Sequence, residues 1–394
     1  TKKATTDYRL ECSRIGNMIS SASSFSDWAE LYRKIVFWES ELEKSTDPGM
    51  SEILMMQENE ANNSFSKFVM KNYLGWLDPK NENAPLMSPS LFSSKILPHV
   101  SPGQSLFFIL IDNMRFDQWK KISAELTGLY RIMDEDIYCS ILPTATQFSR
   151  NAIFAGMMPS RIVATTPQYW ISDNEEEGKN EFEEELFKNQ LAGKRLRISW
   201  SYHKISNSQE GRKVNEKIKQ LLENDLNILV FNFVDILSHA RTEIGLIRDL
   251  AGDESAYRSI VRSWFIHSSL FELLNMLASH PVKIIFSTDH GTIRVQNPLK
   301  IIGDKKTSAN LRYKMGRNLN YNPAEVFELR DPEAAFLPRA NISSRYIFAR
   351  NKDYLVYQNN FNYYAGYYKD TFQHGGISMQ EMLLPVVLLE PVIK

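Results

Sequence analysis

The chain has 394 residues but only two cysteines, no excess of charge of either sign and no long hydrophobic run. Cys12 and Cys139 cannot form a disulfide framework, which favours a reducing compartment, and we expect a cytoplasmic protein. The net charge of −1 gives no overall field that would attract nucleic acid or an anionic membrane. No apolar run approaches the roughly 18–20 residues of a membrane span, and the basic start Thr1-Lys2-Lys3 lacks the apolar stretch of a signal peptide. We therefore expect no membrane insertion.

What is present indicates a folded protein with more than one domain. Hydrophobic residues make up 43% of the chain and charged residues 24%, so a sizeable core can be buried. At roughly 150 residues per domain, the length allows about two to three domains. Because the chain begins with threonine, we expect a fragment or a processed product.

Residues 1–77 are predicted to form a small helical bundle. Asp27 and Glu30 have the spacing of a helix start, and apolar residues then recur at helical spacing up to Leu42. We expect the aromatic side chains of this region to form its core, with a partner-docking face as the alternative. Residues 78–104, which are rich in proline, are predicted to be a linker.

Residues 105–394 alternate between predicted strands and helices. Buried strands are expected at five short apolar runs: Leu106–Ile111, Leu196–Trp200, Asn227–Val234, Lys283–Ser287 and Leu383–Leu389. Helical periodicity separates two of them over Tyr257–Leu277. This alternation predicts an α/β fold in which helices cover both faces of a mostly parallel central sheet. The acidic residues Glu175–Glu177, Glu181 and Glu183–Glu185 are expected to form a solvated loop and helix face, with a metal site as the alternative.

Three predicted strands run into an aspartate, namely Asp112, Asp235 and Asp289. One such aspartate alone is commonly a helix cap. In open α/β sheets, however, ligands bind beyond the carboxyl ends of the strands, and two of these aspartates are accompanied by His239 and His290. The pattern therefore indicates a site for a bound cation.

A third histidine, His374, is followed by two glycines and lies just before the last predicted strand. Three aspartates and three histidines exceed the ligand set of a single tetrahedral zinc ion. Oxygen and imidazole ligands without cysteine favour catalytic zinc, with manganese as second choice. Two metal ions about 4 Å apart would clamp a transferring phosphoryl group from both sides.

A nucleophile is expected at Thr146. The stretch Gln147–Ala155 is predicted to be a short helix that follows a proline-stiffened turn at Pro143. A hydroxyl in its first turn would gain from the helix dipole and from free backbone N–H groups. The alternative role for Thr146 is to cap this helix.

These residues carry a resemblance to a known superfamily. The motifs stand in the order Asp112, Pro143-Thr-Ala-Thr146, Asp235-x-x-x-His239, Asp289-His290-Gly291 and His374-Gly-Gly. In this order they resemble the alkaline phosphatase superfamily, which implies its three-layer sandwich for residues 105–394. The run Ile111–Arg115, with Gly375-Gly376-Ile377-Ser378 and Glu381, resembles the PglZ branch. The helical residues 1–77 joined to that domain are similar to PorX-type response regulators of the type IX secretion system, whose receiver domain is absent from this chain.

The resemblance implies a phosphodiesterase with two Zn²⁺ ions. The ligands implied for the two ions are Asp235, His239 and His374 for one, and Asp112, Asp289 and His290 for the other. Thr146 would bridge them as the nucleophile and form a phospho-threonine that water then hydrolyses. Asn113 and Arg115 are weaker candidates for contacting the phosphoryl oxygens, with a surface helix position as the alternative for Arg115.

A long insertion, about 292–370, separates Asp289-His290 from His374. Residues 295–352 hold 11 Lys and Arg against 5 acids, a local charge of +6, and a tyrosine-rich stretch follows. Basic groups for phosphates and aromatic rings for bases are typical of sites for single-stranded nucleic acid. The alternative is a solvated basic flap with an aromatic core. The resemblance implies cyclic or linear oligonucleotides as substrates.

Other functions stay open from the sequence alone. The chain could be a catalytically silent scaffold that signals through contacts with a sigma factor or a sensor kinase, because a fold does not decide function. A sulfatase would need Cys or Ser in place of Thr146, and no third metal set for a monoesterase is found. The regulator context also makes a homodimer of the full-length protein plausible.

Overall fold

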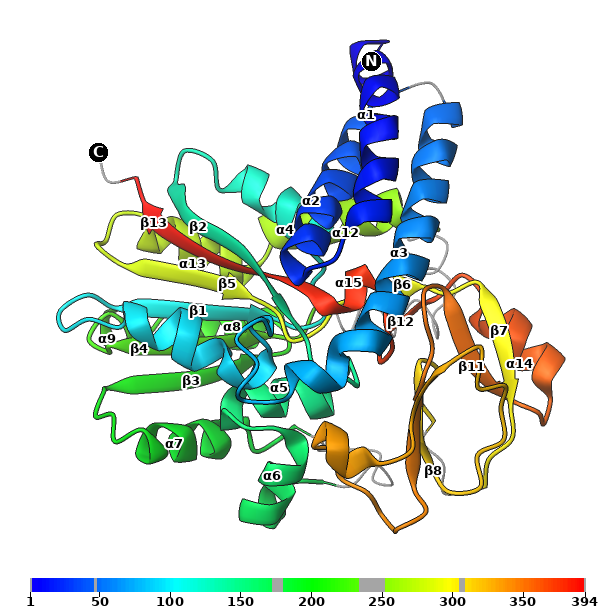
Figure 1. Ribbon diagram of the computed structural model, residues 1–394. Coiled ribbons are helices and arrows are strands. Elements are labelled where there is room, and N and C mark those ends of the chain that lie inside the picture. Colours follow the sequence, from blue (N-terminus) through cyan, green and yellow to red (C-terminus); the bar gives the residue numbers. More distant parts are fainter. Residues whose placement is uncertain (1, 46–47, 172–179, 234–251, 305–308, 393–394) are drawn as a thin grey trace.

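The computed structural model describes residues 2–45, 48–171, 180–233, 252–304 and 309–392. Figure 1 shows a helical bundle standing on an α/β domain, with a smaller β-rich insertion at one side. No described helix combines the length and the apolar character that a membrane crossing requires.

The N-terminal region is helical, as predicted. Its helices are α1 (Lys2–Ser21), α2 (Phe25–Leu42) and α3 (Pro48–Trp76). A capping box of Ser24 and Asp27 begins α2, so Asp27 is the third helical residue and not the cap that the sequence pattern predicted. The aromatic side chains form a core, as the contact between the rings of Trp28 and Phe65 illustrates (centroids 5.6 Å apart).

The segment 78–104 packs against the sheet and is more than a connecting linker. It contains the short helices Ser88–Ser90, Phe92–Ile96 and Leu97–His99. Leu91, Phe92 and Ile96 are fully buried, and the ring of Phe92 lies 5.0 Å from that of Phe108 in the sheet. The prolines mark the turns of this segment, but its apolar side chains decide where it lies.

A six-stranded sheet forms the centre of the α/β domain, in the order β2-β13-β5-β1-β4-β3. The strands are β1 (Leu106–Ile111), β2 (Tyr130–Cys139), β3 (Trp200–Ile205), β4 (Leu226–Phe231), β5 (Lys283–Ser287) and β13 (Leu383–Pro391). Five strands run parallel and β13 runs against them, because it pairs antiparallel with both β2 and β5. The mostly parallel sheet is thus confirmed.

Helices cover both faces of this sheet and give three layers (Figure 1). One face carries α4 (Phe116–Glu125), α8 (Ser208–Asn215), α9 (Ile218–Leu221), α12 (Glu254–Ile266) and α13 (Ser269–Leu277); the other carries α5 (Thr146–Ala155), α6 (Pro159–Thr165) and α7 (Glu183–Gly193). In β1, Phe107, Ile109 and Ile111 face one core while the alternate residues face the other. A strand buried on both faces reads as a continuous apolar run, which explains why the sequence located β1 correctly.

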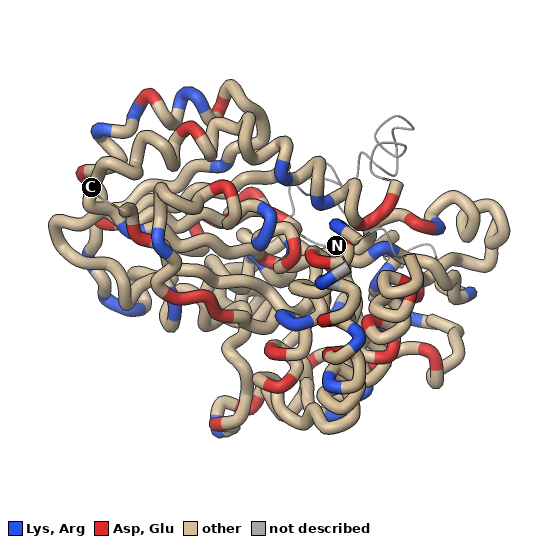
Figure 2. Tube along the Cα trace, turned by 90° about the horizontal axis from the view of Figure 1, so that it is seen from above, with Lys and Arg blue, Asp and Glu red and all other residues tan. Residues whose placement is uncertain are grey.

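The insertion forms a small β-rich unit beside the sheet. Its elements are β6 (Ile293–Arg294), β7 (Asn297–Ile301), β8 (Tyr313–Gly316), β9 (Phe327–Leu329), β10 (Arg345–Phe348), β11 (Asp353–Tyr357) and α14 (Phe361–Tyr368), and β12 (Phe372–Gln373) closes it by pairing with β6. Several of its cations have acidic partners: Arg317 with Asp304, Arg330 and Arg345 with Glu328, and Arg339 with Glu333. Positive and negative positions alternate along much of the tube in Figure 2.

Candidate metal centre and nucleophile

The candidate residues lie on loops at one edge of the sheet. Asp112 follows β1, Asp289 comes shortly after β5, and Thr146 begins α5 after β2. These strands are parallel, so their carboxyl ends meet at the same edge. His374 precedes β13, which runs in the opposite direction and therefore begins at that edge.

Three of the predicted ligands come together. Asp112, Asp289 and His290 each offer one ligand atom, and these atoms lie within 4.8 Å of one another. All three residues are buried. Asp235 and His239 lie outside the residues that the structure describes.

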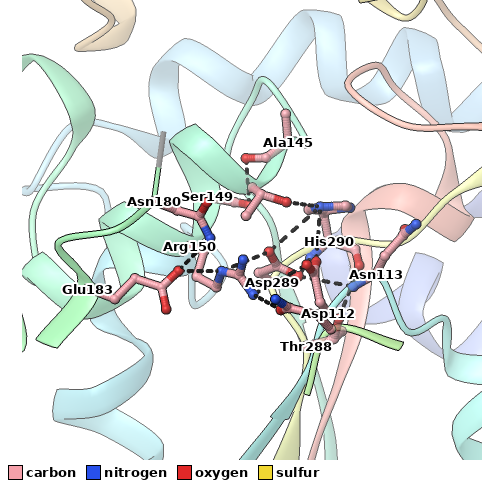
Figure 3. Close-up of polar contacts among 12 residues, drawn as sticks. Asp112, Asn113, Ala145, Ser149, Arg150, Asn180, Glu183, Thr288, Asp289 and His290 are labelled. Carbon is pink, nitrogen blue, oxygen red and sulfur yellow. Dashed lines mark hydrogen bonds and ion pairs between the residues drawn. The ribbon is translucent and has the colours of Figure 1, made fainter. Parts of the chain in front are cut away.

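The protein fixes one oxygen of each carboxylate. Asp289 Oδ1 accepts hydrogen bonds from the backbone N–H groups of Asn113 (3.2 Å) and His290 (3.0 Å). Asp112 Oδ2 lies 3.3 Å from Nη1 of Arg150. The other oxygens, Asp112 Oδ1 and Asp289 Oδ2, lie 3.7 and 3.6 Å from Nε2 of His290 (Figure 3). Two oxygens and a ring nitrogen therefore face a common point.

Both histidines of the site present Nε2. Nδ1 of His290 lies 2.9 Å from the carbonyl oxygen of Gly291, and Nδ1 of His374 lies 3.0 Å from that of Thr144. A carbonyl can only accept, so each Nδ1 carries a proton, and the neutral form of each ring then has its lone pair on Nε2. This is the arrangement in which backbone groups orient metal-binding histidines. The two rings stack with centroids 4.1 Å apart, so His374 belongs to the same centre.

Thr146 is placed as a nucleophile would be. Its Oγ1 lies 3.0 Å from Nε2 of His290. Within residues 141–150 Thr146 is only half-buried, whereas all the others are buried. Ala145 holds the cap position of α5, so the hydroxyl of Thr146 is not used as the helix cap. It stands in the first turn, where the backbone N–H groups favour negative charge.

Arg150 lies in this cluster, and the sequence interpretation did not identify it. It lies one helical turn after Thr146 and is 1% exposed. Its guanidinium contacts Asp112, Asp289 (3.8 Å) and Glu183 (2.8 Å), as Figure 3 shows. Although burial alone would lower the pKa of Arg150, these three carboxylates raise it. The signal was its i, i+4 spacing from the nucleophile, which puts both residues on one helix face.

Glu183 was expected in a solvated run, and that expectation is wrong for this residue. It is fully buried and accepts hydrogen bonds from Tyr202 (2.5 Å) and Asn180 (2.8 Å). Its neighbour Glu184 is exposed, in line with the expectation. The sequence gives no local sign of this difference, because the partner cation Arg150 comes from a different helix.

The two weaker candidates for substrate contacts differ in their surroundings. Arg115 is buried, pairs with Asp117 (2.6 Å) and Glu254 (2.7 Å), and lies against the ring of Phe372, so its donors are used inside the protein. The surface position considered for it is also wrong. Asn113 is fully buried, and among the described residues neither its amide nitrogen nor its amide oxygen has a hydrogen-bond partner. Such a group beside Asp112 fits contact with a ligand.

Glycine is required at two points where backbone segments of the site approach each other. A Cβ on Gly291 would lie 1.7 Å from the carbonyl oxygen of Gln380, and one on Gly376 would lie 2.5 Å from that of Ala349. A side chain at Gly291 would push the loop that carries His290 away from Gln380, and one at Gly376 would push the loop that carries His374 away from Ala349.

The donor set fits a divalent metal ion. Carboxylate oxygen and imidazole nitrogen without thiolate suit zinc or manganese in a catalytic site. This cluster contains the three buried carboxylates of Asp112, Asp289 and Glu183. Its two cations are Arg150 and Lys204, whose Nζ lies 4.0 Å from Glu183, so negative charge is left over. Buried charge of one sign requires a counter-ion, and a cation at Asp112, Asp289 and His290 would provide it.

Comparison with known families identifies the family of the chain. The family model of the BREX system PglZ alkaline phosphatase-like domain matches residues 91–389, which is most of the chain. The chain belongs to the PglZ family. Residues 1–77 match the model of the PorX response regulator linker domain, so this PglZ domain follows a helical region of the type found in response regulators. No curated protein matches the chain.

Solved structures of similar fold include two hydrolases. Human ectonucleotide pyrophosphatase/phosphodiesterase 5 is similar over 72% of this chain and 87% of its own, with 10% identity and a TM-score of 0.49. Phosphonoacetate hydrolase from Sinorhizobium meliloti 1021, in complex with phosphonoformate, is similar over 73% and 90%, with 11% identity and a TM-score of 0.45. At this level the likeness does not extend to function.

Proposed function

We propose that the protein is a zinc-dependent phosphodiesterase that cleaves cyclic or linear oligonucleotides with Thr146 as its nucleophile. The observation that carries this proposal is the 3.0 Å contact between Thr146 Oγ1 and His290 Nε2, beside two buried aspartates. The proposed ligands of two Zn²⁺ ions, with Mn²⁺ as second choice, are Asp112, Asp289 and His290 for one, and His374 with Asp235 and His239 for the other.

The metal, when bound, lowers the pKa of the hydroxyl and polarises the phosphoryl group. Thr146 Oγ1 would give up its proton to water and attack phosphorus, while the bond to one nucleotide oxygen breaks and that oxygen takes a proton from water. Water would then hydrolyse the phospho-threonine, which still carries the other nucleotide, to release a phosphate monoester and the free hydroxyl. The N–H groups at the start of α5 supply positive partial charge to the phosphoryl oxygens. Asn113, with both amide atoms available, is a candidate for a further phosphoryl contact.

Cavities beside α5 and in the insertion support an extended substrate. A cavity of about 370 Å³ adjoins the nucleophile helix; its lining includes Gln147, Phe148, Trp170, Arg317, Arg339 and Tyr346. Aromatic faces with arginines at their margin suit a base and its phosphate. A second cavity of about 660 Å³ lies in the insertion, with Lys314 and Tyr364 among its lining residues.

The helical region supports a signalling role for the proposed activity. Because residues 1–77 match a response regulator linker, we propose that the PglZ domain is the output domain of a two-component regulator that controls type IX secretion. A sensor kinase and a sigma factor are the proposed protein partners, with a homodimer as the state of the full-length regulator and the cytoplasm as its location.

Metal analysis combined with hydrolysis of bis- and mono-p-nitrophenyl phosphate tests the proposal. We expect two zinc ions per chain and a preference for the diester that Thr146→Val abolishes while the metal content stays unchanged. His267→Gln, at an exposed histidine of α12's C-terminal end, is the matched control and should change neither quantity. A protein that binds no metal and hydrolyses neither ester is instead the silent scaffold.

A further inference from the structure

The guanidinium of Arg150 stands where a metal ion's charge would act. It lies between the carboxylates of Asp112 (Nη1–Oδ2 3.3 Å) and Asp289 (Nε–Oδ2 3.8 Å), both of them proposed metal ligands. We propose that Arg150 is an internal counter-ion that keeps these two buried carboxylates in place when no metal is bound. This inference deepens the proposed function, since it rests on the two aspartates being metal ligands.

Two buried carboxylates this close repel each other strongly unless a positive charge is near. Asp112 and Asp289 each have an oxygen within 4 Å of the same imidazole nitrogen, and both are at most 2% exposed. Water therefore does not screen their repulsion, and the low local dielectric strengthens it. A positive charge that belongs to the protein reduces this penalty when no ion from solution is bound.

The position of Arg150 is fixed from its far side. Glu183 Oε1 lies 2.8 Å from Nε of Arg150, and Glu183 is itself held by Tyr202 and Asn180. Asn232, one residue beyond β4, accepts a hydrogen bond from Nη1 at 3.3 Å. Anchored in this way, the guanidinium cannot follow the aspartates toward an incoming metal ion, and Asp112 presents its other oxygen to the ligand side (Figure 3).

Arg150 also joins the carboxylates to the nucleophile. It is the fifth residue of α5 and Thr146 is the first, so one rigid helical turn sets the distance between the hydroxyl and the counter-ion. Arg150 is thus a positioning residue: it acts through Asp112 and Asp289 and does not itself take part in bond making.

The counter-ion role predicts a stability defect that depends on metal. Arg150→Met keeps the aliphatic part of the side chain and removes the charge. In a chelator, we expect the melting temperature of the full chain to fall by on the order of 10 °C, as for other buried ion pairs that lose one partner. With zinc added, the gap to the unaltered protein should shrink to less than half, because the ion replaces the missing charge.

Two further variants keep the test decisive if Arg150→Met unfolds under both conditions. Arg150→Lys, which keeps the charge, should lose less than half as much stability in the chelator. In the double variant Asp112→Asn/Arg150→Met, removal of one carboxylate should recover part of the melting temperature lost in Arg150→Met. An equal gap with and without zinc, together with no recovery in the double variant, would overturn the counter-ion role.

The outcome separates this inference from the proposed function. If zinc does not bind the unaltered protein but the double variant recovers stability in the chelator, the counter-ion pairing stands and the metal-dependent enzyme is wrong. If zinc binds and diesters are cleaved but Arg150→Met melts like the unaltered protein in the chelator, the enzyme stands and this inference fails.

Discussion

The hydroxyl of Thr146 lies 3.0 Å from Nε2 of His290, and the carbonyl of Gly291 holds the other ring nitrogen at 2.9 Å. With the proton of the neutral ring on Nδ1, Nε2 accepts and the threonine hydroxyl is the donor. A metal ion bound at Nε2 would use the same lone pair, so the ion would take the place of this hydrogen bond and leave the hydroxyl beside it. A change at His290 should disturb both.

His290→Gln is expected to lower bound zinc by about one equivalent per chain and diester hydrolysis by at least about 100-fold, since a loss of ligand geometry affects affinity and rate together. Elemental analysis and initial rates measure the two effects. His267→Gln, an exposed histidine, serves as the control for a histidine change without metal contact. Full zinc content in His290→Gln would contradict its role as a ligand.

Trp170 is expected to contribute to recognition of a base. It is half-buried, lines the cavity beside α5, and its ring packs edge-on against Phe148 at 5.5 Å. Trp170→Ala should raise KM for a linear dinucleotide about tenfold, the cost of losing one stacking contact. Hydrolysis of bis-p-nitrophenyl phosphate should change by less than about twofold.

Trp264 provides the matched control for this prediction, because it is also half-buried but stacks on Phe233, away from the cavity that Trp170 lines. Trp264→Ala should leave KM for the dinucleotide unchanged. Equal losses on both substrates in Trp170→Ala would mean that the ring supports the fold of the site and does not bind a base.

The carboxylate of Asp117 should make the free energy of unfolding depend on pH in the acidic range. Burial alone would raise its pKa, but Arg115 and Arg258 outweigh burial and lower it from 3.8 to about 2. A lowered pKa stabilises the folded state above the unfolded pKa, and this contribution is lost as the pH falls through the folded value. Asp117→Asn should therefore cost about 2 kcal/mol of unfolding free energy, constant from pH 7 to 5 and shrinking below about pH 4. Urea unfolding of both proteins across this range measures the difference; a difference that grows on acidification would contradict the assignment.

Tyr73 links the helical bundle to the loop that leads to Thr146. Its hydroxyl accepts a hydrogen bond from the backbone N–H of Leu142 at 2.8 Å, and both residues are fully buried. Tyr73→Phe should reduce the free energy of unfolding by about 1–3 kcal/mol, because the N–H of Leu142 would lose its partner. Tyr363→Phe, at a residue that is 66% exposed, should change it by less than about 0.5 kcal/mol.

The strands that the sequence located well are those buried on both faces. β1 and β5 were predicted with their observed bounds, because a strand that is buried on both faces reads as a continuous apolar run in the sequence. The edge strand β2 was missed: residues 131–134 are exposed, residues 134–136 are acidic, and the strand contains no long apolar run. The other edge strand, β3, begins at Trp200, where the predicted strand ended. Edge strands carry polar residues for solubility, which removes the signal that periodicity detects.

The sequence by itself determined which chemistry the chain can hold, since aspartates after strands, histidines beside them and a threonine at a helix start are local features. Only the tertiary structure decided that Arg150 pairs with Glu183 and with the aspartates, and that Arg115 is buried. The proton positions on His290 and His374 also depend on it. The physical reason is that a charged group or an aromatic ring pairs with the groups that folding brings next to it, and those groups lie far apart along the chain.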